Sequence, residues 1–127
     1  MISRLAKRLP LLAAALIALP LAAQAAQPFD GKAFADAQAA GKSILVDVTA
    51  PWCPTCAKQQ PIIEGLEREQ PQLLVLSVDF DSAKDVLKQF GVQAQSTLIV
   101  FKGKTEVARA TGPTDPAVIH ALVAKGL

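Results

Sequence analysis

Two cysteines, Cys53 and Cys56, offer the plainest chemistry in this sequence. They are the only cysteines among 127 residues, and they lie three positions apart. A disulfide between them closes so small a loop that it removes little entropy from the unfolded chain, which makes it a weak structural crosslink. The pair is better suited to opening and closing, so the spacing predicts thiol–disulfide redox chemistry.

The residues around the pair indicate how the two thiols divide this chemistry. Pro54 follows Cys53 directly, and proline is favoured in the first turn of a helix, so we expect a helix to begin there. A thiol at a helix N-terminus lies at the positive end of the helix dipole, which lowers its pKa. We therefore expect Cys53 to be an exposed nucleophile. Cys56, one turn further on, is expected to be more buried and to resolve the mixed disulfide.

Asp47 is the third candidate catalytic residue, because it interrupts the apolar run at residues 44–48. A carboxylate in such a strand is costly unless it has partners or a role, and burial should raise its pKa. From the strand that leads to Cys53, it could take the proton of Cys56 directly or through a water. The alternative is a structural aspartate at the strand end that caps a neighbouring backbone group.

Three further residues beside the thiols are candidate substrate contacts. Trp52 precedes Cys53, where it can shield the sulfur or offer an apolar contact to a substrate chain. The alternative for Trp52 is a simple core role. Pro54 and Thr55 lie between the cysteines, and this dipeptide also influences the redox potential. The only histidine, His120, is expected to point to solvent.

The elements that must position these residues alternate along the chain. Helices are expected over about residues 31–40, 54–70, 83–90 and 115–125, and strands over 44–48, 73–78, 98–101 and 106–110. Continuous apolar runs such as 44–48 are typical of strands buried on both faces of a sheet. This order predicts an α/β fold in which a central mixed sheet is flanked by helices on both faces.

Several helix details are also predicted. Asp81–Ser82 and Thr114 are expected to cap the last two helices, because short polar side chains accept hydrogen bonds from free helix amides. The final helix is expected to bury four apolar side chains (Val118, Ile119, Leu122 and Val123). In the helix that follows Cys53, four charged residues are expected to form a solvated face (Lys58, Glu64, Glu67 and Arg68).

The N-terminal segment has the pattern of a secretory signal peptide. Residues 1–8 carry three basic residues and no acidic one, residues 9–22 are almost wholly apolar, and Ala23-Gln24-Ala25 forms a small-x-small cleavage site. The sequence therefore predicts a signal peptide over residues 1–25, one mature domain over residues 26–127 and a periplasmic location. The alternative is an uncleaved membrane anchor, although the apolar run is short and contains two prolines.

Charge excludes some classes of partner for the mature domain. Residues 1–25 hold three of the 13 basic residues and none of the 11 acidic ones, so the remaining 102 residues carry 10 basic and 11 acidic residues, a net charge of −1. No basic surface is expected that would bind nucleic acid. We expect a monomer that works without nucleic acid.

The sequence resembles the thioredoxin superfamily over about residues 34–127. The resemblance rests on several segments (Val46-Asp47 through Cys56, Pro61, Phe90-Gly91-Val92, Thr97 to Gly103, and Thr111-Gly112). It implies a thioredoxin fold and disulfide exchange without a cofactor. It also implies roles for Cys53, Cys56 and Asp47 like those given above. The implied partners are protein disulfide substrates and a thiol electron donor, for which a membrane redox protein is one candidate.

One position departs from the family pattern. Thioredoxins carry a cis-proline before the threonine that is Thr97 here, whereas this chain has Ser96. A cis bond before a residue other than proline costs about 3–4 kcal/mol, so the Gln95–Ser96 peptide is expected to be trans. The substrate-contact loop formed by Gln95, Ser96 and Thr97 would then be reshaped. The Ser96 hydroxyl could hydrogen-bond the Cys53 thiolate; the alternative is a tolerated loop residue.

The leading hypothesis is therefore an exported thiol:disulfide oxidoreductase that acts as a reductant. A second hypothesis is a binding module in which the same two thiols take up Cu(I), which accepts few, soft ligands. A third is a catalytically weak family member whose disulfide stays closed. A closed zinc site needs four ligands, which two cysteines in one chain cannot supply, so no metal ligand is assigned.

Overall fold

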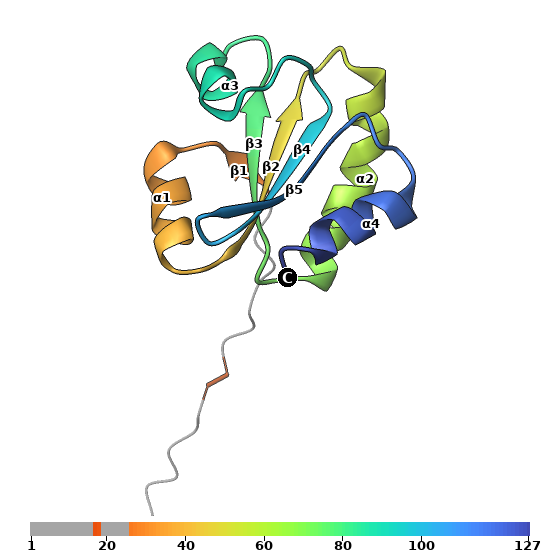
Figure 1. The fold of residues 1–127 in the computed structure, drawn as a ribbon. Coiled ribbons are helices and arrows are strands. Elements are labelled where there is room, and N and C mark those ends of the chain that lie inside the picture. The colour runs from red at the N-terminus through yellow and green to blue at the C-terminus, as the bar shows by residue number, and fades with distance from the viewer. Residues whose placement is uncertain (1–16, 19–25) are drawn as a thin grey trace, which may run out of the picture.

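The computed structural model describes residues 17–18 and 26–127, so almost all of the predicted signal peptide lies outside the described residues. From the N-terminus the elements are β1 (Gln27–Pro28), α1 (Gly31–Ala39), β2 (Ser43–Thr49), α2 (Pro54–Glu69), β3 (Leu74–Asp79), α3 (Lys84–Phe90), β4 (Thr97–Lys102), β5 (Thr105–Thr111) and α4 (Pro116–Ala124) (Figure 1). Within this part of the chain, no helix is long and apolar enough to cross a membrane.

The five strands form one mixed sheet in the order β1-β3-β2-β4-β5. β2 pairs in parallel with β3 and antiparallel with β4, which in turn pairs antiparallel with β5. The predicted α/β class with a central mixed sheet is therefore confirmed. Only β1 was missed, because a strand of two residues that pairs with β3 is too short to show a periodic pattern.

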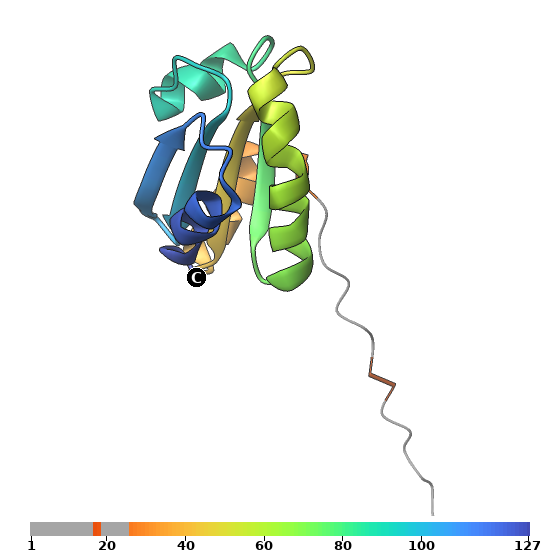
Figure 2. The ribbon, with the colours of Figure 1, turned by 90° about the vertical axis from the view of Figure 1, so that its right-hand side faces the viewer.

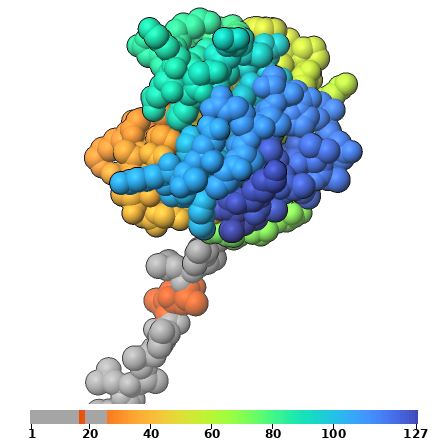
Figure 3. Space-filling model, in the orientation of Figure 1, coloured from red at the N-terminus to blue at the C-terminus, as the bar shows by residue number. Residues whose placement is uncertain are grey.

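Helices cover both faces of this sheet. α1 and α3 pack on one face, where Phe34 and Leu87 meet the side chains of Ile44, Val46 and Val48. α2 and α4 pack on the other face, in a cluster that includes Leu45 of β2 (Figure 2). Side chains alternate along a strand, so Asp47 shares the α2 face with Leu45. In the space-filling view, α3, the β4–β5 hairpin and α4 meet in one continuous surface (Figure 3).

Three chain segments meet at one end of the sheet. β2 and β3 run toward the end where α3 lies and where α2 begins (Figure 1). β4 starts at this end, because Thr97 pairs with Val48 near the end of β2. β5 finishes there, because Thr111 pairs with Thr97. The topology therefore brings the segment before β4 and the segment after β5 to the end of the sheet from which Cys53 follows.

The structure corrects the predicted caps. Asp79 accepts hydrogen bonds from the amides of Asp81 (2.8 Å) and Ser82 (3.1 Å), and α3 begins after Ala83 without a side-chain cap. Asp115, not Thr114, caps α4 by accepting from the Ala117 amide at 2.8 Å. In α4 the neighbouring Asp115 therefore replaces the predicted cap, whereas Asp79 binds the amides of Asp81 and Ser82 themselves, in the turn before α3.

The final helix buries fewer side chains than predicted. Ile119, Leu122 and Val123 are buried in α4, but Val118 is 49% exposed. Val118 is adjacent to Ile119 in sequence, and consecutive helix residues point about a quarter-turn apart, so one of them is turned toward solvent. His120 is exposed, as predicted.

Candidate active site

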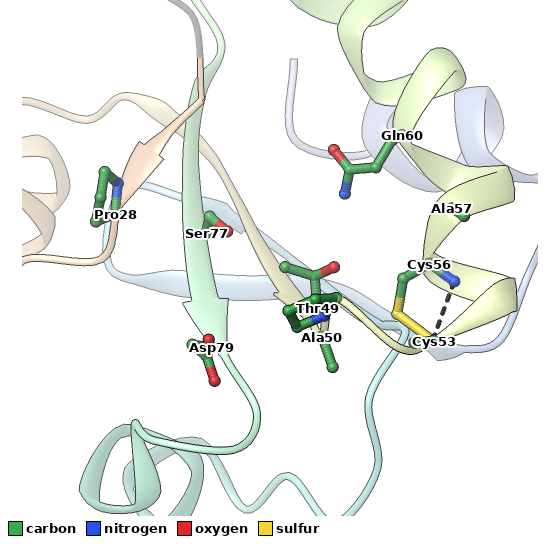
Figure 4. A pocket seen from close by; sticks show the side chains of 10 residues that line it. Pro28, Thr49, Ala50, Cys53, Cys56, Ala57, Gln60, Ser77 and Asp79 are labelled. Atoms are coloured by element: carbon green, nitrogen blue, oxygen red, sulfur yellow. Dashed lines mark hydrogen bonds between the residues drawn. A yellow bond between two sulfur atoms is a disulfide. The ribbon is translucent and has the colours of Figure 1, made fainter.

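Cys53 lies at the junction between β2 and α2, as the proline beside it predicted. Its backbone is extended (φ −89°, ψ 109°) and it forms the N-cap of α2. Its sulfur accepts a hydrogen bond from the Cys56 amide at 3.1 Å (Figure 4). The two cysteines form a disulfide, with their Cα atoms 5.3 Å apart. The helix start therefore directs a backbone donor at the sulfur that the sequence assigns as nucleophile, which stabilises its thiolate form.

Both cysteines are buried in this disulfide form. Cys53 is 2% and Cys56 1% exposed, so the expectation of an exposed Cys53 is wrong here. The cause is packing, because the pair forms a small cluster with Ala50 and Phe80. Both cysteines nevertheless line a surface hollow of about 530 Å³ between α2 and the edge of the sheet that carries β3 (Figure 4).

Trp52 lies on the surface beside this buried pair. The side chain is 56% exposed, so the alternative of a core tryptophan is wrong. Its indole N–H donates to the Asp81 carboxylate at 2.7 Å. Asp81 belongs to the turn held by Asp79. The backbone amides of Ser82 and Asp81 donate hydrogen bonds to the Asp79 carboxylate and lower the pKa of Asp79. A hydrogen-bonded turn after β3 therefore fixes the exposed ring next to Cys53.

The two residues between the cysteines lie at the same surface. Pro54 is exposed and Thr55 is half-buried. Neither these two residues nor Trp52 lines the hollow that the cysteines line. Their predicted role as substrate contacts stays a prediction.

Asp47 is buried, as predicted, at 2% exposure. It lies inside β2, paired with Ser77 and Leu98, so the alternative of a strand-end cap is wrong. Its Oδ2 accepts a hydrogen bond from the Gln60 side-chain amide at 3.0 Å, while Oδ1 has no hydrogen-bond partner. Burial raises the pKa of Asp47, and the bond from Gln60 partly offsets this. A carboxyl with a raised pKa beside the helix of Cys56 is suited to accept a proton.

Glu67 corrects the predicted solvated face of α2. It is only 5% exposed, and its Oε2 is buried without a partner. Burial raises the pKa of Glu67, and a hydrogen bond from the Ala26 backbone opposes this shift. The other members of that face (Lys58, Glu64 and Arg68) are exposed as expected. The sequence could have indicated this burial, because Glu67 follows Ile63 by four residues and so lies on the same buried face of the helix.

The loop of Gln95, Ser96 and Thr97 has a trans backbone, as predicted, since no peptide bond of the described residues is cis. Ser96 has φ 58°, a left-handed conformation that costs on the order of 1–3 kcal/mol for a residue other than glycine. Its amide donates to the Val48 carbonyl at 2.7 Å. Its hydroxyl donates to the Gln95 carbonyl at 2.6 Å, so in the disulfide form it does not donate a hydrogen bond to the Cys53 sulfur.

Thr97 and Gln59 hold this loop from two sides. The Thr97 hydroxyl donates to the Ala94 carbonyl at 2.8 Å. Gln59, which is fully buried in α2, donates from its side-chain amide to the carbonyls of Ser96 (3.1 Å) and Pro113 (2.9 Å). Sequence reasoning missed Gln59, although a polar residue one turn after Cys56 on the buried side of a helix is a signal of a specific partner.

A metal would have few ligands at this site. Over residues 17–18 and 26–127 the structure brings together no group of three or more histidine, cysteine or acidic side chains that could hold a metal ion. The two thiols of Cys53 and Cys56 are thus the whole ligand set that this region offers to a soft metal.

Comparison with known proteins gives one family. The Thioredoxin family model matches residues 25–125. Thioredoxin from Chlamydia muridarum is 39% identical over 92 residues, 72% of this chain and 89% of that protein. The bifunctional thioredoxin reductase/thioredoxin of Mycobacterium leprae is 34% identical over 91 residues, 71% of this chain and 20% of that protein. The crystal structure of Trxlp from Edwardsiella tarda matches with a TM-score of 0.74 at 40% identity, covering 78% of this chain and 98% of that one.

Substitution of Asp47 by asparagine tests the electrostatics of the site. Burial raises the pKa of Asp47 above its ordinary 3.8, so the folded protein keeps this proton at pH values where the unfolded chain has lost it. The free energy of unfolding then falls as the pH rises from about 4 through the folded-state pKa. Asp47→Asn should remove this contribution. The variant should be more stable than the wild type at pH 8, with an advantage that shrinks toward pH 4.

Urea unfolding of the oxidised protein across this pH range measures the effect. Asp85→Asn is the matched control, because Asp85 is an exposed aspartate of α3, and its profile should follow the wild type. A profile of Asp47→Asn that runs parallel to the wild type at every pH would contradict a raised pKa.

Proposed function

This chain belongs to the thioredoxin family and is a thiol:disulfide oxidoreductase of the thioredoxin type, and we propose that it works outside the cytoplasm as a reductant of protein disulfides. The observation that carries the activity is the Cys53–Cys56 disulfide at the start of α2, with the Cys56 amide donating to the Cys53 sulfur. Export from the cytoplasm and the direction of electron flow are our proposals.

The proposed reaction begins with the reduced pair. The Cys53 thiolate attacks one sulfur of a substrate disulfide, so a Cys53–substrate disulfide forms and the other substrate sulfur leaves as a thiolate. Cys56 then gives its proton to Asp47 and attacks the Cys53 sulfur. The Cys53–Cys56 disulfide forms, the second substrate sulfur is released, and two electrons have passed to the substrate. A donor dithiol returns the pair to its reduced form.

The buried carboxyl suits the second step. A Cys56 thiol without exposure to water needs an internal proton acceptor before it can attack, and Asp47 lies on the face of β2 that packs against α2. The raised pKa of Asp47 makes it a stronger base than an exposed aspartate. We therefore assign proton transfer from Cys56 to Asp47.

The donor is proposed to be a dithiol protein of the thioredoxin-reductase type. The Mycobacterium leprae relative, whose name joins a thioredoxin reductase to a thioredoxin, supports this class of donor. For an exported domain, a membrane redox protein is the other candidate. We propose that the protein acts as a reductant and that it is a monomer.

Export is proposed from the pattern of residues 1–25. The basic start, the apolar run and Ala23-Gln24-Ala25 support cleavage after Ala25, with a mature domain over residues 26–127 in the periplasm. β1 begins at Gln27, so cleavage there would leave every strand and helix of the described domain intact.

A second candidate function is Cu(I) uptake by the same thiols. It is favoured by Ser96, which replaces the proline that faces the thiols in the family and leaves the loop in a trans, left-handed form. Two thiolates suit Cu(I), which accepts low coordination by soft ligands.

The disulfide exchange is tested by the reduction of insulin with dithiothreitol as the electron source. The wild type should accelerate the reaction, and Cys53→Ser should abolish the acceleration because the remaining thiol, Cys56, is buried and does not reach a substrate disulfide. Cys56→Ser should instead accumulate a mixed disulfide between Cys53 and the substrate. Asp47→Asn keeps both thiols and should slow the resolution of that mixed disulfide by about 10²-fold.

The direction of electron transfer is tested by measuring the redox potential of the Cys53–Cys56 pair at equilibrium with glutathione. A reductant should have a potential well below that of the glutathione couple. A potential far above it would show an oxidant, and insulin reduction that survives in Cys53→Ser would remove this cysteine from the mechanism. A wild type without activity would support the third hypothesis, a permanently closed disulfide.

The export is tested by expressing the full chain in a Gram-negative bacterium. The periplasmic fraction should contain a protein whose intact mass begins at Ala26. Ala25→Leu should block cleavage, since the site requires small residues, whereas Gln24→Leu at the middle position should not. Full-length chain in the membrane fraction for the wild type would instead indicate an uncleaved anchor.

Cu(I) uptake is tested by titrating the reduced protein in competition with a chelator that reports free Cu(I). The second function predicts one Cu(I) per chain, with binding lost in both Cys53→Ser and Cys56→Ser. Equal retention of copper by the wild type and these variants would place the metal elsewhere and contradict a dithiolate site.

A further inference from the structure

Gln59 joins three segments of the chain at the end of the sheet where the disulfide lies. Its side chain is fully buried in α2. Its amide nitrogen donates to the Ser96 carbonyl at 3.1 Å and to the Pro113 carbonyl at 2.9 Å. These partners are 37 and 54 residues away in sequence, so one side chain fixes the segment before β4 and the segment after β5 onto α2.

The position of Gln59 ties this link to the thiols. Gln59 follows Cys56 by three residues, and helix residues at this spacing lie on the same face one turn apart. Ser96 is therefore held against the face of α2 that carries Cys56. The Ser96 amide also donates to the Val48 carbonyl at 2.7 Å, near the end of the strand that leads to Cys53. The loop is thus fixed to both elements from which the cysteines project.

The hydrogen bonds determine the orientation of the Gln59 amide. Two carbonyl oxygens face its nitrogen, so the reversed orientation would put its oxygen against both of them. The Oε1 atom is buried without a partner. A buried polar oxygen without a partner is unfavourable, and an apolar side chain would avoid it. The two donated bonds are thus what a glutamine supplies here that an apolar residue would not.

The loop that Gln59 holds has a conformation that needs support. Ser96 is the only residue other than glycine with a positive φ among the described residues. The Ser96 carbonyl accepts from Gln59 and also from the Gly112 amide at 2.9 Å. With the Val48 bond, the Ser96 peptide groups are held at three points, which fixes the position of the neighbouring, half-buried Gln95.

We propose that Gln59 is a positioning residue for protein substrates. By fixing the Ser96 carbonyl, it sets the shape of the loop of Gln95 and Ser96 at the end of the sheet where the disulfide lies. A folded or extended substrate chain must fit against this loop, whereas a small disulfide needs only the sulfur of Cys53. Gln59 therefore governs recognition of protein disulfides and leaves the intrinsic reactivity of the thiols unchanged. This inference rests on the disulfide exchange proposed above.

The test compares a large and a small disulfide in one variant. Gln59→Met keeps a long, flexible side chain but removes both donors. The KM for insulin should rise about tenfold, within the range expected for the net loss of two hydrogen bonds, with kcat within about twofold. The rate at which the reduced variant reacts with 5,5′-dithiobis(2-nitrobenzoate) should stay within about twofold of the wild type.

Two controls separate positioning from general damage. Lys58→Met introduces the same residue at the neighbouring exposed position and should leave both substrates unaffected. Ser96→Pro cannot keep φ 58°, because proline fixes φ near −65°, so it relocates the Ser96 carbonyl. In that background Gln59→Met should raise the insulin KM by much less, and this coupling would not arise from a loss of packing alone.

A second measurement covers the case in which Gln59→Met does not fold. In Cys56→Ser, a peptide can be trapped as a mixed disulfide with Cys53. The side-chain amide NMR signals of Gln59 should shift on trapping, while those of the exposed Gln72 should not.

The possible outcomes distinguish the positioning role of Gln59 from the proposed disulfide exchange. Equal loss of activity toward insulin and the small disulfide in Gln59→Met, or unchanged Gln59 signals on trapping, would overturn the positioning role and leave the oxidoreductase activity standing. A wild type that reduces neither disulfide would remove the activity itself.

Discussion

The structure depends on the direct passage from β2 into α2. β2 is buried on both faces, so its end is fixed in the middle of the sheet, and Cys53 caps the helix that begins there. The sulfur takes the place of the oxygen that usually caps a helix, and the Cys56 amide donates to it at 3.1 Å. Helix capping and thiolate stabilisation are thus one interaction. The reactive group is held by local backbone geometry, while its surroundings are supplied by residues distant in sequence.

Those surroundings contain buried polar atoms that the fold does not fully satisfy. Asp47, Gln59 and Glu67 each have one buried oxygen without a hydrogen-bond partner. Each such oxygen costs about 1–3 kcal/mol relative to a satisfied group. Two of the three residues lie on α2 and the third faces it, so these free-energy costs are concentrated on the helix that carries the thiols. Glu67 lies in the last turn of α2, but Gln59 is one turn from Cys56 and Asp47 lies on the strand that leads to Cys53, so at these two residues stability is lost close to the thiols.

The sequence was informative where a strong local pattern decided the structure. Pro54 after Cys53 predicted the helix start, and the apolar run around Asp47 predicted a strand buried on both faces. The missed features around the disulfide depend on distant partners, whereas the caps of α3 and α4 were missed through neighbouring residues. Trp52 is held on the surface by Asp81, 29 residues away, and Gln59 reaches Ser96 across 37 residues. No local pattern encodes which polar side chain will find such a partner, and the burial of Cys53 likewise depends on Phe80.

Ser96 shows how this chain can do without the proline of its family. A proline has no amide hydrogen, so it could not donate to the Val48 carbonyl as Ser96 does at 2.7 Å. The serine extends the contact between the loop and β2 by one hydrogen bond, and the bonds from Gln59 and Gly112 to its carbonyl fix the other side. Together these bonds offset the strain of a positive φ. The loop is therefore held rigid by hydrogen bonds, where a proline would hold it rigid through its ring. Because one of these bonds comes from Gln59, the shape of the loop depends on α2 as well as on its own residues.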